Sequence, residues 1–148
     1  MSKRRIVVTG MGMLTPLGAD LESSWQGLTA GKSGIAPIQS FDTTDYSVRF
    51  GGHVPEFDIS DYLPPKEARR MDGFMQFGLV AGIQAMRDSG LEVTDENRDR
   101  IGVAVGSGIG GIVTIETCHD VVNNRGPAKV SPFFVPSCII NMIAGHLS

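Results

Sequence analysis

Two short runs of β-branched and apolar residues, each followed at once by glycine, predict two buried strands. The first covers residues 6–9 and is followed by Gly10, and the second covers residues 101–106, in which Gly106 closes the run. Such runs without polar alternation are typical of strands covered on both faces of a sheet. A further short strand is predicted at residues 48–50, inside the proline-rich region 35–65. That region is otherwise expected to be irregular.

Apolar residues that recur every three or four positions predict the helices. A first helix runs from Asp20, its expected N-cap, to about Ala30. The longest helical pattern, residues 66–89, is apolar on most of its faces, which indicates a buried helix. Two further helices are predicted over residues 112–123 and 139–144. The order strand, helix, long helix, strand, helix implies a layered α/β fold.

Two local patterns suggest how these elements pack. Gly78 and Gly82 lie four residues apart in the long helix, so they allow another element to approach closely. Residues 131–136 (SPFFVP) place two adjacent phenylalanines between prolines. This segment is predicted to be extended and apolar, either in the core or against a lipid-like pocket or a subunit interface.

Composition narrows the function classes. The 148 residues correspond to about one domain, and 41% hydrophobic with 20% charged residues is typical of a folded globular chain. The 13 Lys+Arg against 16 Asp+Glu give a net charge of −3, which argues against a nucleic-acid surface spread over the chain. The apolar run after the basic residues 3–5 is too short for a signal peptide, and residues 77–83 are too few to span a bilayer. We therefore expect a cytoplasmic protein without membrane contact.

The loop at residues 106–111 (GSGIGG) satisfies the G-x-G-x-x-G pattern between a predicted strand and a predicted helix. A dinucleotide site also needs an acidic residue about 20 positions later, and residues 121–148 contain no Asp or Glu. Close packing of the loop is therefore favoured, with a dinucleotide-binding module as an alternative.

The cysteines and histidines point to no metal, disulfide or catalytic pair. Cys118 and His119 are adjacent, so on a helix their side chains diverge and cannot share a proton. With Cys138 and His146 they match no zinc spacing, and two cysteines without a CxxC spacing predict no disulfide framework.

A positive cluster stands out in this acidic chain. Lys66, Arg69 and Arg70 fall at i, i+3 and i+4, so they share one face of a helix. Such a face suits docking of an acidic partner or a phosphate, and Lys129 could extend it. The alternative is an ordinary solvated face.

Five colinear segments carry a resemblance that spans the whole chain: residues 7–18 (VVTGMGMLTPLG), 70–78 (RMDGFMQFG), 106–111 (GSGIGG), 131–136 (SPFFVP) and 141–146 (NMIAGH). Together they resemble the N-terminal part of the bacterial β-ketoacyl–acyl-carrier-protein synthases, nearest to the elongating type II enzymes of fatty acid synthesis. The resemblance implies a thiolase-like, layered α/β/α fold, with its first half incomplete in this chain, and a homodimer.

The resemblance also implies an acyltransferase. The family joins an acyl chain, held as a thioester on a cysteine, to malonyl on acyl carrier protein, and carbon dioxide leaves. Two histidines assist the decarboxylation, and no redox cofactor or metal is needed. The expected partners are acyl carrier protein and acyl and malonyl thioesters, without nucleic acid.

Residue by residue, the resemblance places Ile109 at the inner acyl pocket and Phe134 at the pocket of the partner subunit. It places Lys66, Arg69, Arg70 and Lys129 at the carrier-docking surface. The nucleophile and both histidines are expected beyond residue 148, so residues 1–148 are the N-terminal part of the synthase domain, inactive alone and without a catalytic residue. A non-catalytic chain-length partner subunit is the alternative.

Overall fold

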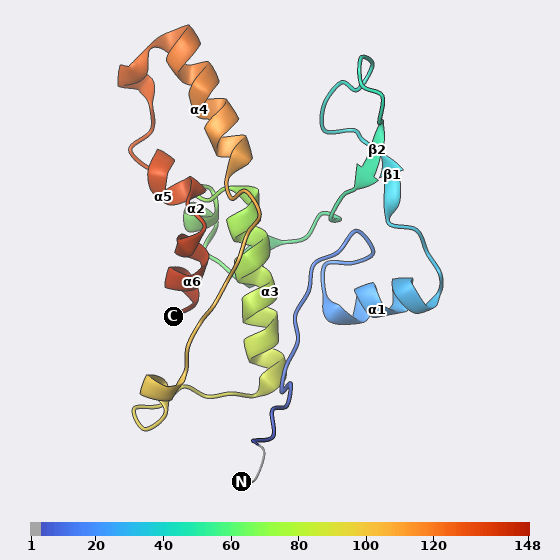
Figure 1. Ribbon diagram of the computed structural model, residues 1–148, viewed down its shortest axis with the longest axis vertical. Helices are drawn as coiled ribbons and strands as arrows, with labels where there is room; N and C mark the ends of the chain where they lie inside the picture. The colour runs from blue at the N-terminus through green and yellow to red at the C-terminus, as the bar shows by residue number, and fades with distance from the viewer. Residues whose placement is uncertain (1–3) are drawn as a thin grey trace. The chain divides into compact units, whose positions relative to one another are not determined.

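The computed structural model describes residues 4–148 and divides into two compact units. One contains the described residues up to Asp58 together with 84–90, and the other contains 59–83 and 91–148. The helices and strands of each are labelled in Figure 1. The first residue of the basic run 3–5 lies outside the described residues. No helix within residues 4–148 is long and apolar enough to cross a membrane.

The first unit contains helix α1 (Leu21–Thr29), which begins as the sequence predicts. Asp20 is its N-cap, and one carboxylate oxygen accepts hydrogen bonds from the backbone N–H and the hydroxyl of Ser23, both at 2.7 Å. This satisfies a donor that the first turn of a helix otherwise leaves unpaired. Gly31, with φ +65°, follows the helix in the left-handed conformation that glycine adopts without strain.

The same unit holds a short hairpin in the proline-rich region. Strand β1 (Ile35–Pro37) pairs antiparallel with β2 (Phe50–Gly52), so the strand predicted at 48–50 is present but shifted by two residues. Gly52, at the end of β2, lies close to Pro16: a Cβ built on it would be 2.7 Å from the proline side chain. The glycine therefore lets the strand approach a neighbouring loop that a larger residue would exclude.

The two predicted buried strands, 6–9 and 101–106, are wrong as strands. Neither segment belongs to a strand in the structure. Among residues 4–148, the sheet that forms consists of β1 and β2. Ile6 and Val8 are 94% and 79% exposed. A strand exists only through pairing, and these segments have the composition of strands without a paired neighbour among the described residues.

The predicted helix 66–89 is interrupted. The structure forms α2 (Pro65–Ala68) and α3 (Gly73–Ser89), because Asp72 begins a new helix instead of continuing the old one. Its carbonyl accepts from the backbone N–H of Met75, and one carboxylate oxygen accepts from the N–H of Phe74. Burial of α3 is also incomplete: Met75, Leu79 and Val80 are buried, while Phe77 is 40% exposed.

The second unit continues with three helices: α4 (Ile112–Arg125), α5 (Phe134–Cys138) and α6 (Asn141–Leu147). The helix predicted from residue 112 is confirmed, and the last one starts two residues later than predicted. Three single-turn 3₁₀ segments complete this unit: η1 (Ile59–Asp61), η2 (Arg98–Arg100) and η3 (Pro127–Lys129).

The extended conformation predicted for residues 131–136 is wrong, because α5 begins inside the segment. The hydroxyl of Ser131 accepts from the N–H of Phe133, and its carbonyl accepts from the N–H of Phe134, which turns the chain into a helix. Pro136 falls in the first turn, where the N–H that it lacks has no intrahelical partner.

The core of the second unit joins α3 to α6 through Met75, Leu79 and Ile143. The predicted close approach at the two helical glycines is confirmed. A Cβ built on Gly78 would lie 2.8 Å from the Ile143 side chain, and one on Gly82 would lie 2.7 Å from Leu147. Side chains of α6 therefore fill the space that the glycines leave on α3.

Candidate functional site

The start of α4 is the common wall of three hollows in the second unit. Thr114 lines all three. The α4–α5 hollow, between residues 113–121 and 129–137, has a volume of about 230 Å³. The arginine hollow, beside Arg69 and Arg70, has about 190 Å³. The α3–α4 hollow, between residues 71–77 and 110–114, has about 500 Å³. Any ligand or partner segment that enters one of them therefore meets the first turn of α4.

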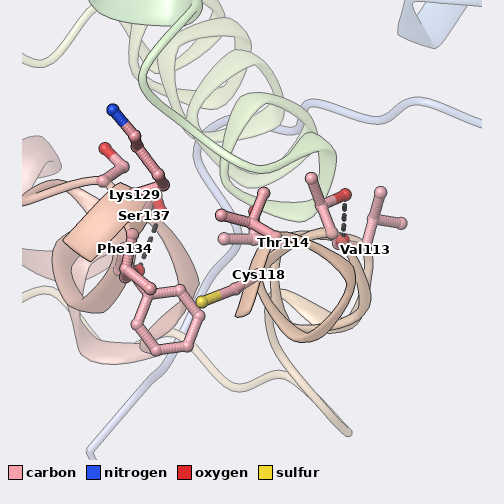
Figure 2. A pocket seen from close by; sticks show the side chains of 10 residues that line it. Val113, Thr114, Cys118, Lys129, Phe134 and Ser137 are labelled. Carbon is pink, nitrogen blue, oxygen red and sulfur yellow. Dashed lines mark hydrogen bonds between the residues drawn. The ribbon is translucent and has the colours of Figure 1, made fainter. Parts of the chain in front are cut away.

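The α4–α5 hollow is mainly apolar (Figure 2). The Phe134 ring and the Cys118 sulfur both point into it. The Ser137 hydroxyl donates to the Phe134 carbonyl and the Thr117 hydroxyl to the Val113 carbonyl, each at 2.8 Å. Because these hydroxyls are already paired with backbone, the hollow suits an apolar group. Ten residues line it: Val113, Thr114, Thr117, Cys118, Val121, Lys129, Val130, Ser131, Phe134 and Ser137.

The arginine hollow is polar and brings part of the predicted docking cluster together. Arg69 and Arg70 line it with Ser131, Phe133 and Ser137, and the guanidinium carbon of Arg70 lies 4.4 Å from the centre of the Phe133 ring. This is a cation–π contact, so Arg70 is held against the start of α5 while it carries its charge.

The remaining docking candidates lie close to this arrangement. Lys129 lines the α4–α5 hollow, which shares Thr114, Ser131 and Ser137 with the arginine hollow. Lys66 is exposed on α2, three residues before Arg69, and lines neither hollow. The single positive helical face predicted for residues 66–70 is therefore corrected: α2 ends at Ala68, and Arg69 and Arg70 lie in the turn after it.

Ile109 lies in the loop before α4 and is 69% exposed. The structure does not bring it together with Phe134 around the α4–α5 hollow. The glycines after Ile109 have the close-packing role favoured by the sequence: a Cβ on Gly110 would lie 2.9 Å from the Cys138 carbonyl, and one on Gly111 would lie 2.6 Å from the Cys138 Cα. Gly106 and Gly108, in contrast, have open space around them.

Asp72 is a buried polar residue that the sequence analysis missed. Its side chain accepts hydrogen bonds from the backbone N–H groups of Phe74 and Thr114, and its own N–H donates to the Ser137 carbonyl. A signal was present, since an Asp directly before an apolar helical run is a typical N-cap. It was hidden by the apparent continuity of the pattern from residue 66 to residue 89.

The cysteines and histidines form no reactive pair in the part of the chain that the structure describes. Both cysteines are free, and the Cys138 thiol donates to the Val135 carbonyl at 3.4 Å. His119 contacts Asn123 and Asp120 on its own helix. Within residues 4–148, no group of three His, Cys, Asp or Glu side chains is placed to hold a metal ion.

Comparison with known proteins settles the family. A family model described as "Beta-ketoacyl synthase, N-terminal domain" matches residues 3–148. The chain belongs to the β-ketoacyl synthase family. A 3-oxoacyl-acyl-carrier-protein synthase 2 of Vibrio cholerae serotype O1 is 63% identical over all 148 residues, which make up 36% of that relative's length.

Solved ketosynthases share the fold. The ishigamide ketosynthase/chain length factor is 25% identical with a TM-score of 0.79, over 99% of this chain and 36% of that one. A type II PKS acyl-carrier protein in complex with its ketosynthase, bound to the hexaketide, contains a chain 26% identical with a TM-score of 0.75, over 96% of this chain and 38% of that one. The predicted thiolase-like fold class is confirmed, and the chain spans just over a third of these relatives' length.

Proposed function

We propose that this chain is the N-terminal part of a condensing enzyme of fatty acid synthesis, an elongating β-ketoacyl–acyl-carrier-protein synthase. The 63% identity with a 3-oxoacyl-acyl-carrier-protein synthase 2 supports the proposal. In the reaction, a cysteine thiolate outside this sequence holds the acyl chain as a thioester. Malonyl on the carrier protein loses carbon dioxide, its α-carbon attacks the thioester carbonyl, and the thiolate leaves. The product is a β-ketoacyl thioester two carbons longer than the starting acyl chain, and the reaction as written needs no metal or redox cofactor.

In this proposal residues 1–148 supply binding groups and no chemistry. Lys66, Arg69, Arg70 and Lys129 dock the acidic carrier protein, while Ile109 and Phe134 line the acyl pocket, Phe134 across a homodimer. The observation that carries the docking role is the gathering of Arg69, Arg70 and Lys129 on two hollows that share walls at the start of α4. The proposed location of the enzyme is the cytoplasm.

Charge reversal tests the docking role in the full-length protein. The double variant Lys66→Glu with Arg69→Glu is expected to raise KM for carrier-bound malonyl by about tenfold, with a salt-sensitive on-rate, because opposite charge steers the encounter. Both side chains are exposed, so folding is preserved. Lys32→Glu, an exposed lysine of the first unit, is the matched control. An unchanged KM in the double variant would refute docking at this surface.

A second candidate is a non-catalytic chain-length partner, since one structural neighbour is a ketosynthase/chain length factor. The two functions differ in covalent chemistry. The full-length protein, incubated with acyl carrier protein bearing an acyl chain, should gain the acyl mass on one cysteine if it is a synthase. Absence of an acylated cysteine would favour the chain-length partner.

A titration with NAD(P) tests the dinucleotide alternative, and saturable binding would support that alternative.

A further inference from the structure

We propose that Asp72 is a positioning residue that fixes the first turn of α4, and with it the acyl-pocket wall, against α3 and α5. The inference rests on the proposed function, because it assigns a role in acyl-chain selectivity. Asp72 is only 8% exposed, although carboxylates are seldom buried without a partner.

The carboxylate joins the starts of two helices that are far apart in sequence. One oxygen accepts from the Thr114 N–H at 2.8 Å, and the other accepts from the Phe74 N–H at 3.3 Å. Both donors lie in the first turns of α4 and α3, where backbone N–H groups lack intrahelical partners and the helix dipole favours a negative charge. The N–H groups at the two helix starts therefore stabilise the buried Asp72 carboxylate, as a neighbouring cation would.

The backbone of Asp72 adds a third element. Its N–H donates to the carbonyl of Ser137 in α5 at 3.3 Å, and Ser137 is itself buried. The next carbonyl in α5, that of Cys138, accepts from the Gly111 N–H at 3.0 Å. Gly111 therefore lies between Asp72 and Cys138: a Cβ there would come within 3.2 Å of the carboxylate and 2.6 Å of the Cys138 Cα.

This geometry connects the residues proposed for acyl binding. Ile109 precedes Gly111 by two residues, and Phe134 begins the helix whose end Asp72 and Gly111 contact. Without the carboxylate, the N–H of Thr114 loses its acceptor and the first turn of α4 is held from one side only. We expect the pocket wall to become less well defined, so that chains of different length are accepted more equally.

The test compares Asp72→Asn, Asp72→Ala and the wild type in the full-length protein. Asparagine keeps the size and one acceptor oxygen but has no charge. The matched control is Asp20→Ala, which removes a carboxylate N-cap from α1 in the first unit. The first measurement, hydrogen exchange at the Thr114 amide, does not depend on the enzyme's activity. Exchange should be fastest in Asp72→Ala, intermediate in Asp72→Asn and unchanged in Asp20→Ala.

The second measurement is the ratio of kcat/KM between the preferred acyl chain and one several carbons shorter. We expect the ratio to fall by on the order of tenfold in Asp72→Ala and to stay constant in Asp20→Ala. A general loss of stability would lower both rates and leave the ratio unchanged. If Asp72→Ala does not fold, hydrogen exchange at Thr114 and the kcat/KM ratio are measured on Asp72→Asn, and these results decide the proposal.

The outcomes separate the two proposals. Unchanged exchange at Thr114 overturns the contact, and faster exchange with an unchanged ratio overturns the role in selectivity. A folded wild type that performs no condensation contradicts the proposed function and the selectivity role with it, while the exchange result still decides the contact. Faster exchange together with the lower ratio supports the inference.

Discussion

At the scale of single residues, Gly111 is a position where a side chain has no room. Gly111→Ala would place a methyl group 2.6 Å from the Cys138 Cα, a backbone atom that cannot turn aside. We expect the free energy of unfolding to fall by about 1–3 kcal/mol, as is typical of overpacking. Urea denaturation of the two proteins measures the difference.

Gly73→Ala is the control, because Gly73 begins α3 and has nothing within 4 Å of its would-be Cβ. This change should leave stability the same or raise it by about 0.4–1 kcal/mol, since alanine restricts the unfolded chain. Equal effects at the two positions would contradict the packing of Gly111 against α5.

The proposed pocket residue Ile109 gives a second prediction at this scale. Ile109→Phe in the full-length protein should reduce kcat/KM for long acyl chains more than for short ones, because the ring occupies pocket space. Folding should be unaffected, since Ile109 is 69% exposed in this chain. Steady-state kinetics over a series of acyl lengths measures the effect, and an equal loss at every length would argue against this placement.

Residue roles were predictable where their partners are near in sequence. Asp20 was identified as an N-cap because Ser23 is three residues away. Asp72 was missed because the residues that explain its burial, Thr114 and Ser137, are distant in sequence and belong to other helices. The cation–π contact of Arg70 with Phe133 was hidden for the same reason.

At the scale of elements, the cap of α1 is sensitive to pH. The Ser23 backbone N–H, with its hydroxyl, holds the pKa of Asp20 below its ordinary value. A lowered pKa in the folded state means that the stabilisation is complete above the carboxyl's unfolded pKa. It is lost as the pH falls through the lower, folded value.

We therefore expect hydrogen exchange of the α1 amides to accelerate, relative to unstructured amides, as the pH falls through the acidic range. Asp20→Asn is the control, because asparagine caps the helix but does not titrate. Asp42, whose pKa the Thr44 hydroxyl and N–H also lower, still titrates in that variant, so the measurement must follow α1 itself. The same pH dependence in wild type and variant would contradict the assignment to Asp20.

Helices and strands differ in how far the sequence alone could predict them. α1 was predicted well because its cap, periodicity and stop are local. α4 was predicted well because its periodicity and the stop at Gly126 are local. The segments 6–9 and 101–106 have the composition of strands, but pairing is decided by neighbours that no local pattern contains. The break between α2 and α3 was missed because Met71, Phe74 and Met75 keep a helical spacing across it, while the capping bonds of Asp72 interrupt the helix.

At the scale of the whole molecule, residues 1–148 by themselves are expected not to condense acyl and malonyl thioesters. Within residues 4–148, neither cysteine has a histidine partner, and Cys138 is bound to its own helix. Release of carbon dioxide from malonyl on carrier protein measures the reaction, with the full-length protein as the positive control. Turnover by the pure 148-residue chain would contradict the prediction.

The space that Gly78 and Gly82 leave on α3 for side chains of α6 affects how the chain folds during its synthesis. The side chains that fill it, Ile143 and Leu147, are translated about 65 residues after the glycines. At roughly 5–20 residues per second, α3 is synthesised about 3–13 s before α6. For that time Met75 and Leu79 lack their Ile143 contacts, so the nascent chain offers chaperones an apolar helix that the finished fold covers.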